Sequence, residues 1–335
     1  MHVLFFPVIF AEKVAVLPEI RRPDFLIHVD KDELFLVECA TIFIYSLKDY
    51  KLKHKFGKRG EGPEEFKVHP GEHVFIDVQP DYILVCSGGR VSFFSRDGRF
   101  LKEAAVRHDG GIIPFAGKYL ATSRVMEEKK GFQVLNILDT GFKKEKEVCR
   151  SELNIQRNKI TFPNATFFFR TYKNHIFVNY IENDFLLDCF DRAGDFEFSL
   201  KNENFRKPAV SDDDEKRMHK RLRQVFGDNY IRNKHRIKIN DYWPAIGMFF
   251  IDNGIIYILT YVKKHIAQKQ HALFYLYDIK GKFLRKIFLP VIERHIFAPY
   301  PLTIKNNKLY QIFENLNTEE WELHMTEIPR SAGCR

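Results

Sequence analysis

Apolar runs, each interrupted once by a short polar break, recur along most of the chain. In "ELFLVECATIFIYSLKDYKL" (residues 33–52), two apolar runs flank a polar break, and a turn follows them. Similar units occupy residues 82–101, 119–142, 175–196, 255–283 and 308–328, although the last has no turn after its second run. Each run has the length of a β-strand, about four to eight residues, so the pattern predicts repeated strand pairs.

A further strand is predicted on either side of each pair. Short apolar stretches precede the units, such as "FLIHVDKD" from Phe25 and "MFFIDNG" from Met248. The turns "RDG", "DTG", "RAG" and "IKG" suit hairpins, because glycine accepts positive φ at little cost. Six units of four antiparallel strands, about 40–55 residues each, are typical of a β-propeller. We therefore predict an all-β, six-bladed β-propeller; a β-sandwich does not explain the regular return of the unit.

The spacing between the fourth and fifth units is longer than the others, which indicates an insertion at about residues 201–240. Within it, "SDDDEKRMHKRLRQVFG" predicts a short helix with Ser211 as N-cap, acidic residues in the first turn and Gly227 as the stop. Three apolar positions share one face at helical spacing: Met218, Leu222 and Val225. The insertion therefore predicts a helix with one apolar face, placed between blades four and five.

Positive charge concentrates in this insertion. The chain has a formal net charge of +9 and a pI of about 9.1, and residues 201–240 hold 12 Lys or Arg against 6 Asp or Glu. Such clustering suits an anionic partner, although a solvated surface helix is the plainer explanation. Five scattered cysteines exclude a disulfide framework and a cysteine zinc site. The candidate contact residues are Lys58, Arg59, Lys216, Arg217, Lys220, Arg221, Arg223, Tyr242 and Trp243.

The stretch "FGKRGEGPEEF" (residues 56–66) lies between the last strand of unit one and the first strand of unit two. It lacks the GxxxxGK[ST] pattern of a phosphate-binding loop, and no helix follows it. We interpret it as an inter-blade connector, in which glycines permit unusual backbone conformations, proline fixes φ and the two phenylalanines fill the wedge between blades. Its structural residues are Phe56, Gly57, Gly60, Gly62, Pro63 and Phe66.

This connector, followed by "HPGEHVFIDVQPDYILV", resembles the G-x-G-P-x-E-F connector of bacterial six-bladed propellers related to the NHL repeat. "NDYWPAIGMFFIDNGIIYIL", from Asn240, resembles a later blade of the same family. The resemblance covers residues 23–328 in organisation and these two stretches in motif. The resemblance implies the fold far more than a function. It also implies an exported protein or lipoprotein, because members of that family in Bacteroidetes and other bacteria are often of this kind.

Residues 23–328 are thus expected to form the propeller, and residues 329–335 a tail. The opening "MHVLFFPVIFAEK", within residues 1–22, resembles the end of a signal peptide but equally suits a first strand. No apolar run approaches the roughly 20 residues of a membrane span. We expect a periplasmic or cell-surface location, with the cytoplasm as the alternative.

These features favour a non-enzymatic binding or interaction module. No catalytic residue or cofactor is predicted, and the expected partner is a protein, a glycan or another anionic ligand. One alternative is a metal-dependent lactonase or lyase, as some six-bladed propellers are, with His28, Asp77 and Asp252 as inner-strand candidates for a divalent metal site. Another is nucleic-acid binding, because some NHL propellers bind single-stranded RNA; that hypothesis predicts steep salt dependence.

Overall fold

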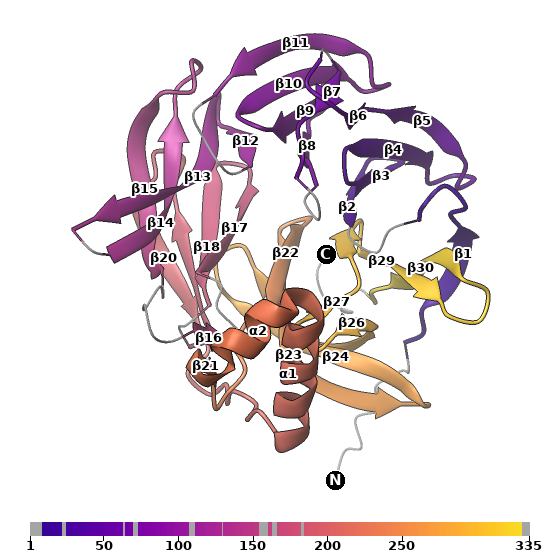
Figure 1. The fold of residues 1–335 in the computed structure, drawn as a ribbon, viewed down its shortest axis with the longest axis vertical. Coiled ribbons are helices and arrows are strands. Elements are labelled where there is room, and N and C mark those ends of the chain that lie inside the picture. Colours follow the sequence, from indigo (N-terminus) through magenta and orange to yellow (C-terminus); the bar gives the residue numbers. More distant parts are fainter. Residues whose placement is uncertain are drawn as a thin grey trace.

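The strands form six four-stranded antiparallel sheets, arranged as blades around a central axis (Figure 1). The protein is therefore the six-bladed β-propeller that the repeat predicts. These observations come from a computed structural model, which describes residues 9–21, 25–62, 64–69, 73–106, 111–128, 130–153, 160–162, 166–181 and 184–329. In blades one to five the strands follow one another in chain order across each sheet.

Blades one to three occupy the first half of the chain. Blade one contains β2 (Phe25–Asp30), β3 (Glu33–Glu38), β4 (Thr41–Ser46) and β5 (Leu52–Phe56). Blade two contains β8 (Phe75–Val78), β9 (Tyr82–Ser87), β10 (Arg90–Ser95) and β11 (Phe100–Ala105). Blade three contains β12 (Ile112–Phe115), β13 (Lys118–Glu127), β14 (Lys130–Leu138) and β15 (Lys144–Leu153).

Blades four to six complete the ring. Blade four contains β17 (Phe167–Tyr172), β18 (His175–Tyr180), β19 (Leu186–Phe190) and β20 (Phe196–Lys201). Blade five contains β22 (Met248–Asp252), β23 (Ile255–Ile266), β24 (Lys269–Asp278) and β25 (Phe283–Pro290). Blade six contains β28 (Leu302–Lys305), β29 (Lys308–Asn315), β30 (Glu320–Glu327) and β1 (Glu12–Val16).

The middle strands of the blades are buried on both faces. In β3 and β4 the four central residues of each six-residue strand are all buried. The outer strand β5 instead alternates exposed with half-buried positions. A blade is sandwiched between two neighbours, so both faces of its central strands lose contact with water, and this requires continuous apolar runs. That requirement explains why the sequence shows unbroken runs in pairs.

Blade six is closed by a strand from the other end of the chain. β1 pairs antiparallel with β30, with a bulge between Lys13 and Ala15, and supplies the outer strand that the sixth unit lacks (Figure 1). The backbone N–H of Leu17 then donates to the carbonyl of Trp321 at 2.8 Å. Residues 1–8, which form most of the stretch that resembles the end of a signal peptide, lie outside the described residues.

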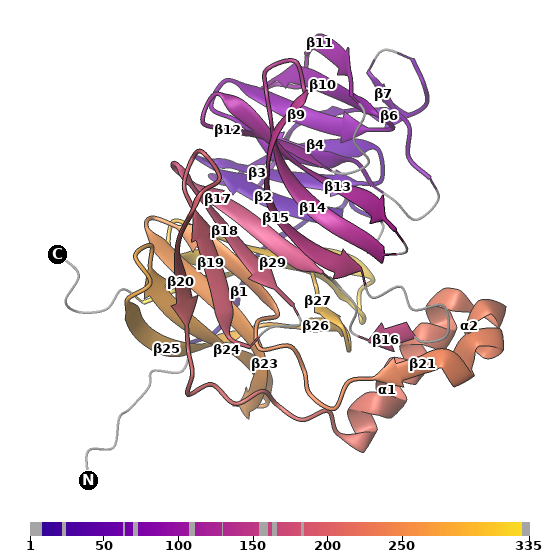
Figure 2. The same cartoon turned by 90° about the vertical axis from the view of Figure 1, so that its left-hand side faces the viewer.

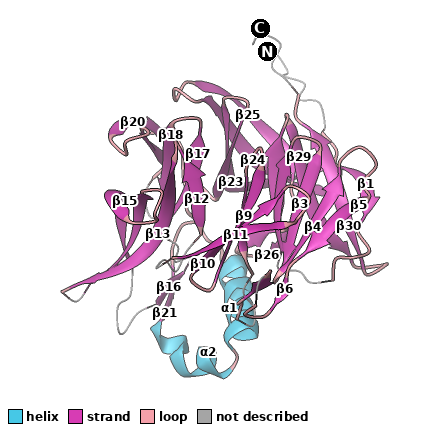
Figure 3. Cartoon of the chain, turned by 90° about the horizontal axis from the view of Figure 1, so that it is seen from above, coloured by secondary structure: helices cyan, strands magenta, loops and turns pink. Residues whose placement is uncertain are grey.

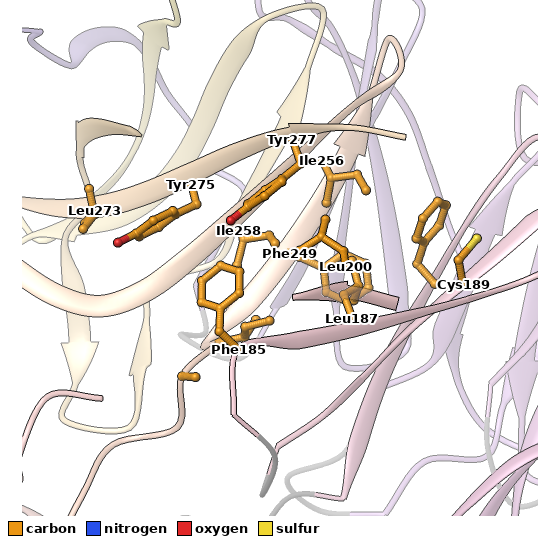
Figure 4. Close-up of a cluster of buried hydrophobic side chains, with 13 residues drawn as sticks. Phe185, Leu187, Cys189, Leu200, Phe249, Ile256, Ile258, Leu273, Tyr275 and Tyr277 are labelled. Carbon is orange, nitrogen blue, oxygen red and sulfur yellow. The ribbon is translucent and has the colours of Figure 1, made fainter. Parts of the chain in front are cut away.

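Hydrophobic clusters fill the wedges between neighbouring blades. One cluster joins blades four and five, where Phe185 meets Tyr275 edge to face with ring centroids 5.2 Å apart (Figure 4). Another joins blade one to blade six and contains Leu17 and Trp321. Because each wedge is built from side chains of two blades, no blade has a complete core of its own.

The stretch at residues 56–66 runs between blades one and two and holds two short strands, β6 (Lys58–Arg59) and β7 (Glu65–Phe66), which pair in parallel. The ring centroids of Phe56 and Phe66 lie 4.8 and 5.8 Å from that of Phe94 in blade two. The Glu65 carboxylate accepts a 2.9 Å hydrogen bond from the N–H of the second glycine of "GEG", and this bond is the main cause that lowers its pKa. In this stretch Glu65 therefore acts as a loop-stabilising group.

The glycines of this connector differ in the reason why they are glycines. Pro63 lies outside the described residues. Gly57 has a φ of +79°, a conformation that other residues rarely adopt. Gly60 and Gly62 have no positive φ; a Cβ at Gly60 would instead lie 2.1 Å from a carboxylate oxygen of Glu65. Close approach, and not left-handed backbone, therefore explains these two glycines.

Replacing Gly57 by alanine is expected to destabilise the protein more than the same change at Gly117. Both have a φ near +80°, but a Cβ at Gly57 would lie 2.7 Å from the carbonyl oxygen of Ala40, whereas one at Gly117 would meet nothing within 4 Å. The common backbone cost cancels, and the steric contact should add about 1–2 kcal/mol. Urea unfolding of the two variants measures this difference; equal midpoints would contradict the argument.

The insertion contains α1 (Asp212–Phe226), α2 (Asp228–Asn233), a 3₁₀ turn (Lys234–Arg236) and β21 (Ile237–Ile239). As predicted, Ser211 caps α1: its Oγ accepts from the N–H of Asp214 at 3.1 Å, and the Asp214 carboxylate accepts from the N–H of Ser211. Gly227 ends the helix with a φ of +50°. Figures 2 and 3 show both helices standing out from one face of the ring.

Two other connections reach toward the insertion, and the sequence does not signal either. β16 (Ile160–Phe162), from the connection between blades three and four, pairs in parallel with β21. β26 (Glu293–His295) and β27 (Ala298–Pro299) form a small hairpin between blades five and six. The insertion is thus held by parts of the chain from the two neighbouring inter-blade connections.

Candidate binding site

The base of the insertion is fixed to blade five by a small buried cluster. Met218 of α1 is fully buried and packs with Trp243 and Ile296, which are each 4% exposed. The indole of Trp243 stacks on the ring of Tyr261, with centroids 4.5 Å apart and planes 18° apart. Helix α1 therefore rests on an aromatic pair supplied by the chain just before blade five and by strand β23.

An ion-pair network borders this cluster. The Glu293 carboxylate lies 3.2 Å from the Arg217 guanidinium of α1 and also pairs with the Lys263 ammonium of β23. Both cations satisfy a carboxylate whose side chain is 14% exposed, and partly buried charges need such partners. The network therefore ties the helix, the fifth blade and the β26–β27 hairpin together at one point.

A pocket of about 210 Å³ lies beside this junction. Its wall is mainly apolar, and its polar side chains among the described residues come from Thr260, Tyr261, Lys263, Gln270 and Glu293. The apolar lining comes from blades four and five, from the chain before blade five, and from the β26–β27 region: Phe168, Ile181, Pro244, Ile246, Met248, Leu259, Ala272, Val291, Ile296, Phe297, Ala298 and Pro299. Such a partly enclosed, mostly apolar hollow with a few polar groups is the usual form of a small-molecule site.

A bulge in blade five shapes the pocket wall. The β23–β24 register shifts between Leu259 and Lys263, so that Thr260 and Tyr261 fall outside the regular ladder. A Cβ added at Gly247 would lie 3.3 Å from the Tyr261 ring, which shows how closely the backbone approaches that ring. Bulges redirect side chains in this way and are frequent beside functional sites. The bulge places Tyr261 in the pocket wall.

Burial raises the pKa of Tyr261 to about 12, and the nearby Glu293 charge acts in the same direction. The hydroxyl is therefore protonated at neutral pH and is both a hydrogen-bond donor and an acceptor. Thr260 is already engaged, because its Oγ1 donates to the carbonyl of Leu273 at 3.0 Å. The Tyr261 hydroxyl is consequently the polar group best suited to orient a bound molecule.

The structure distributes the residues singled out from the sequence over several environments. Trp243 is buried beneath α1, whereas its neighbour Tyr242 is 56% exposed. Arg217 is paired with Glu293, and Lys58 is paired with Glu65 at 3.0 Å. The remaining helix cations lie together on α1: Lys216, Lys220, Arg221 and Arg223. Lys58 and Arg59 lie on β6, on the same face of the ring as the insertion but beside other blades (Figures 2 and 3).

The inner-strand candidates for a metal site come from three blades. His28 of β2 and Asp77 of β8 lie at matching positions in their blades. His28 comes two residues before Asp30, the last paired residue of its strand, and Asp77 comes two residues before Gln79, whose N–H donates to the carbonyl of Tyr82. Burial lowers the pKa of His28 to about 4 and raises that of Asp77 to about 6. Asp252 accepts a 3.1 Å hydrogen bond from the N–H of Asn307 and so links blades five and six.

Among the described residues, no group of three His, Cys, Asp or Glu side chains could hold a metal ion. The metal-dependent alternative and its cofactor stay predictions. Neither helix in the described part of the chain is long and apolar enough to cross a membrane.

Several residues of the site carry no local sequence signal. Glu293 and Ile296 follow blade five in the sequence without a regular apolar pattern. Glu293 lies 76 residues after Arg217, and nothing in its spacing predicts contact with the helix. One feature of the sequence could have indicated Tyr261 and Lys263 as site residues. The fifth unit, residues 255–283, is longer than the first, residues 33–52, and its long strands β23 and β24 extend past the blade to reach the insertion.

No protein-family model matches the sequence, and no curated protein matches it. Similar solved structures include a member of the duf4221 family from Bacteroides vulgatus, 12% identical, with 97% of this chain and 99% of that chain covered and a TM-score of 0.52. The Pan2 WD40 domain of Neurospora crassa is 9% identical over 89% of this chain and 74% of that chain, with a TM-score of 0.43. The AfRom2 CNH domain is 9% identical over 96% and 100%, with a TM-score of 0.38. The first of these likenesses shows that this chain shares the overall fold of the duf4221 protein.

Proposed function

We propose that the chain is a non-enzymatic binding module whose ligand site is the pocket beneath the insertion. The observation that carries this proposal is the wall itself, which is mostly apolar and includes Tyr261 at a bulge. An apolar group with one hydrogen-bonding end fits such a wall, because burial of its surface supplies affinity while one polar contact fixes its orientation.

Binding is favoured over catalysis by the state of the polar groups. Glu293, a carboxylate of the pocket wall, is held between Arg217 and Lys263. Both ion pairs engage this carboxylate in the network that joins the helix to blade five. Tyr261 has a raised pKa and so is not available as a phenolate near neutral pH. The hydroxyl of Tyr261 therefore lacks the phenolate form that a general base requires.

Filling the pocket is expected to weaken the binding of an apolar probe. Ala272 is 2% exposed and lines the pocket, so A272L places three further carbon atoms inside it. N-phenyl-1-naphthylamine, an apolar molecule with one N–H, serves as the probe in a fluorescence titration. We expect at least tenfold weaker binding to A272L, and roughly two- to tenfold weaker binding to Y261F, which loses one hydrogen bond.

The control for this experiment is A193L, which makes the same change at an exposed turn of blade four. Circular dichroism and the melting temperature establish that each variant is folded. A folded A272L protein that binds the probe as tightly as the unmodified chain would refute the pocket as the ligand site.

We also infer a relation to the NHL-repeat propellers and a location outside the cytoplasm. The first is supported by the sequence of residues 56–66, and the second by the apolar opening of the chain followed by Ala11 and Glu12. Cell fractionation with a C-terminal epitope tag tests the location, and recovery of the protein in the cytoplasmic fraction would contradict it.

A further inference from the structure

The corner between α1 and α2 leaves three large apolar side chains in water. Val225 is 55% exposed, Phe226 49% and Ile231 59%. Nearer the start of α1, on the same face of the helix, Met218 and Leu222 are buried at the junction with the ring. The apolar face of the helix thus continues beyond the part of the propeller that supports it, and its end is uncovered.

Positive charge surrounds these side chains. Between residues 216 and 238 there are nine Lys or Arg and one acidic residue, Asp228. Arg217 is paired with Glu293, and Arg236 donates to the side-chain oxygen of Asn233. Within the described part of the chain, the other seven make no ion pair: Lys216, Lys220, Arg221, Arg223, Arg232, Lys234 and Lys238. The corner therefore presents uncompensated cations together with exposed apolar groups.

We propose that this corner docks the propeller on the surface of an anionic lipid bilayer. Lipid phosphate and carboxylate groups would contact the cations, while Val225, Phe226 and Ile231 enter the boundary between headgroups and acyl chains. Helical segments that bind membrane interfaces combine Lys and Arg with large apolar side chains in this way. The inference goes beyond the proposed ligand pocket and does not depend on it.

Nucleic acid is the competing anionic partner, and the apolar residues argue against it. Nucleic-acid contacts use cations for phosphates and aromatic or guanidinium planes for bases. Two aliphatic side chains, Val225 and Ile231, have no such role, and their burial would require an apolar phase. Exposed apolar side chains beside cations are complementary to both layers of an anionic bilayer surface.

The base of the insertion holds the corner in a fixed orientation. Ala209 and Tyr242 form a β-bridge where the chain leaves and returns, and the N–H of Trp243 donates to the carbonyl of Pro208 at 2.9 Å. Figure 2 shows the helices at the outer limit of that face of the ring. A flat surface can therefore reach the corner without a collision with the blades.

Vesicle flotation tests the proposal with the full chain. Large unilamellar vesicles of phosphatidylcholine alone, or with 30% phosphatidylserine, are compared at 100 and 500 mM NaCl. We expect binding to the anionic vesicles at low salt, weaker binding at high salt, and none to neutral vesicles. The double variant R223Q/R232Q should bind the anionic vesicles about fivefold less for each cation removed.

A second double variant separates insertion from simple electrostatic attraction. F226S/I231S keeps every charge and should bind the anionic vesicles at least tenfold less. The matched control for it is F196S/L316S, which changes two exposed apolar residues of other blades, 59% and 80% exposed. The matched control for the charge variant is K280Q/K282Q, two exposed lysines at the turn of blade five. Both controls should bind like the unmodified chain.

Two results would overturn the proposal. One is the absence of flotation with anionic vesicles at 100 mM NaCl. The other is flotation that F226S/I231S leaves unchanged, together with tight binding of single-stranded RNA that R223Q/R232Q abolishes, because the corner would then be a nucleic-acid site. Binding of N-phenyl-1-naphthylamine in the pocket is measured on the same variants. This measurement shows whether a variant has lost vesicle binding, probe binding or both.

Discussion

Replacing Leu17 by alanine is expected to lower the free energy of unfolding by about 2–5 kcal/mol. Leu17 is fully buried at the junction of blades one and six, where it packs with residues of both blades and lies one residue beyond β1. Its truncation leaves a cavity at the point where the ring closes, and rigid surroundings close such a cavity only in part. Urea unfolding followed by tryptophan fluorescence measures the loss, since Trp321 belongs to the same cluster.

L316A is the matched control for this change. Leu316 lies in the turn between β29 and β30 of blade six and is 80% exposed, so its truncation should change stability by less than about 0.5 kcal/mol. If L17A were as stable as L316A, the packing of Leu17 between blades one and six would contribute nothing to stability.

Replacing Glu322 by glutamine is expected to cost roughly 2–3 kcal/mol at pH 7. The carboxylate, on β30, is 4% exposed and lies 3.0 Å from the Lys13 ammonium of β1. It also lies 2.9 Å from the Asn315 amide nitrogen and 2.8 Å from Nε2 of His324. Glutamine keeps the shape but removes the charge that these three donors stabilise.

The pH dependence of this effect has a definite sign. Burial alone would raise the pKa of Glu322, but the hydrogen bonds from Asn315, His324 and Lys13 outweigh it and lower the pKa from 4.5 to about 2. A lowered folded-state pKa means that the stabilisation is complete above the unfolded value and is lost as the pH falls toward 2.

The stability difference between the unmodified chain and E322Q should therefore shrink between pH 5 and about pH 2. E320Q, which changes an exposed carboxylate of the same strand, should show no such trend. A difference for E322Q that stays constant over this range would contradict the assignment.

Local signals made the blades and the helix predictable. The continuous apolar runs of β3 and β4 follow from burial on both faces, and Ser211 and Gly227 fix the ends of α1 through their own backbone contacts. Such features depend on residues a few positions apart, so the sequence displays them directly.

Contacts between distant segments were not predictable in the same way. The strand at Glu12–Val16 is short, and its pairing with β30 depends on the whole ring being in place. The sequence offered one indirect sign, the missing strand after the sixth unit. The pocket is harder still, because its wall combines Tyr261 of β23 with Ile296 from the connection between blades five and six. Burial of Trp243 likewise depends on where Met218 arrives.

Closure of the ring by β1 also constrains the order in which the protein assembles. Lys13 and Glu322 lie 309 positions apart, so the strand that the ribosome makes early waits for a partner made near the end of synthesis. Pairing over such a separation is slow, since a large chain entropy is lost before any contact forms. In the meantime β30 and β1 each carry an unpaired edge, and an edge of this kind accepts the same strand of a second copy. We therefore expect refolding at high protein concentration to raise the fraction of strand-exchanged dimers.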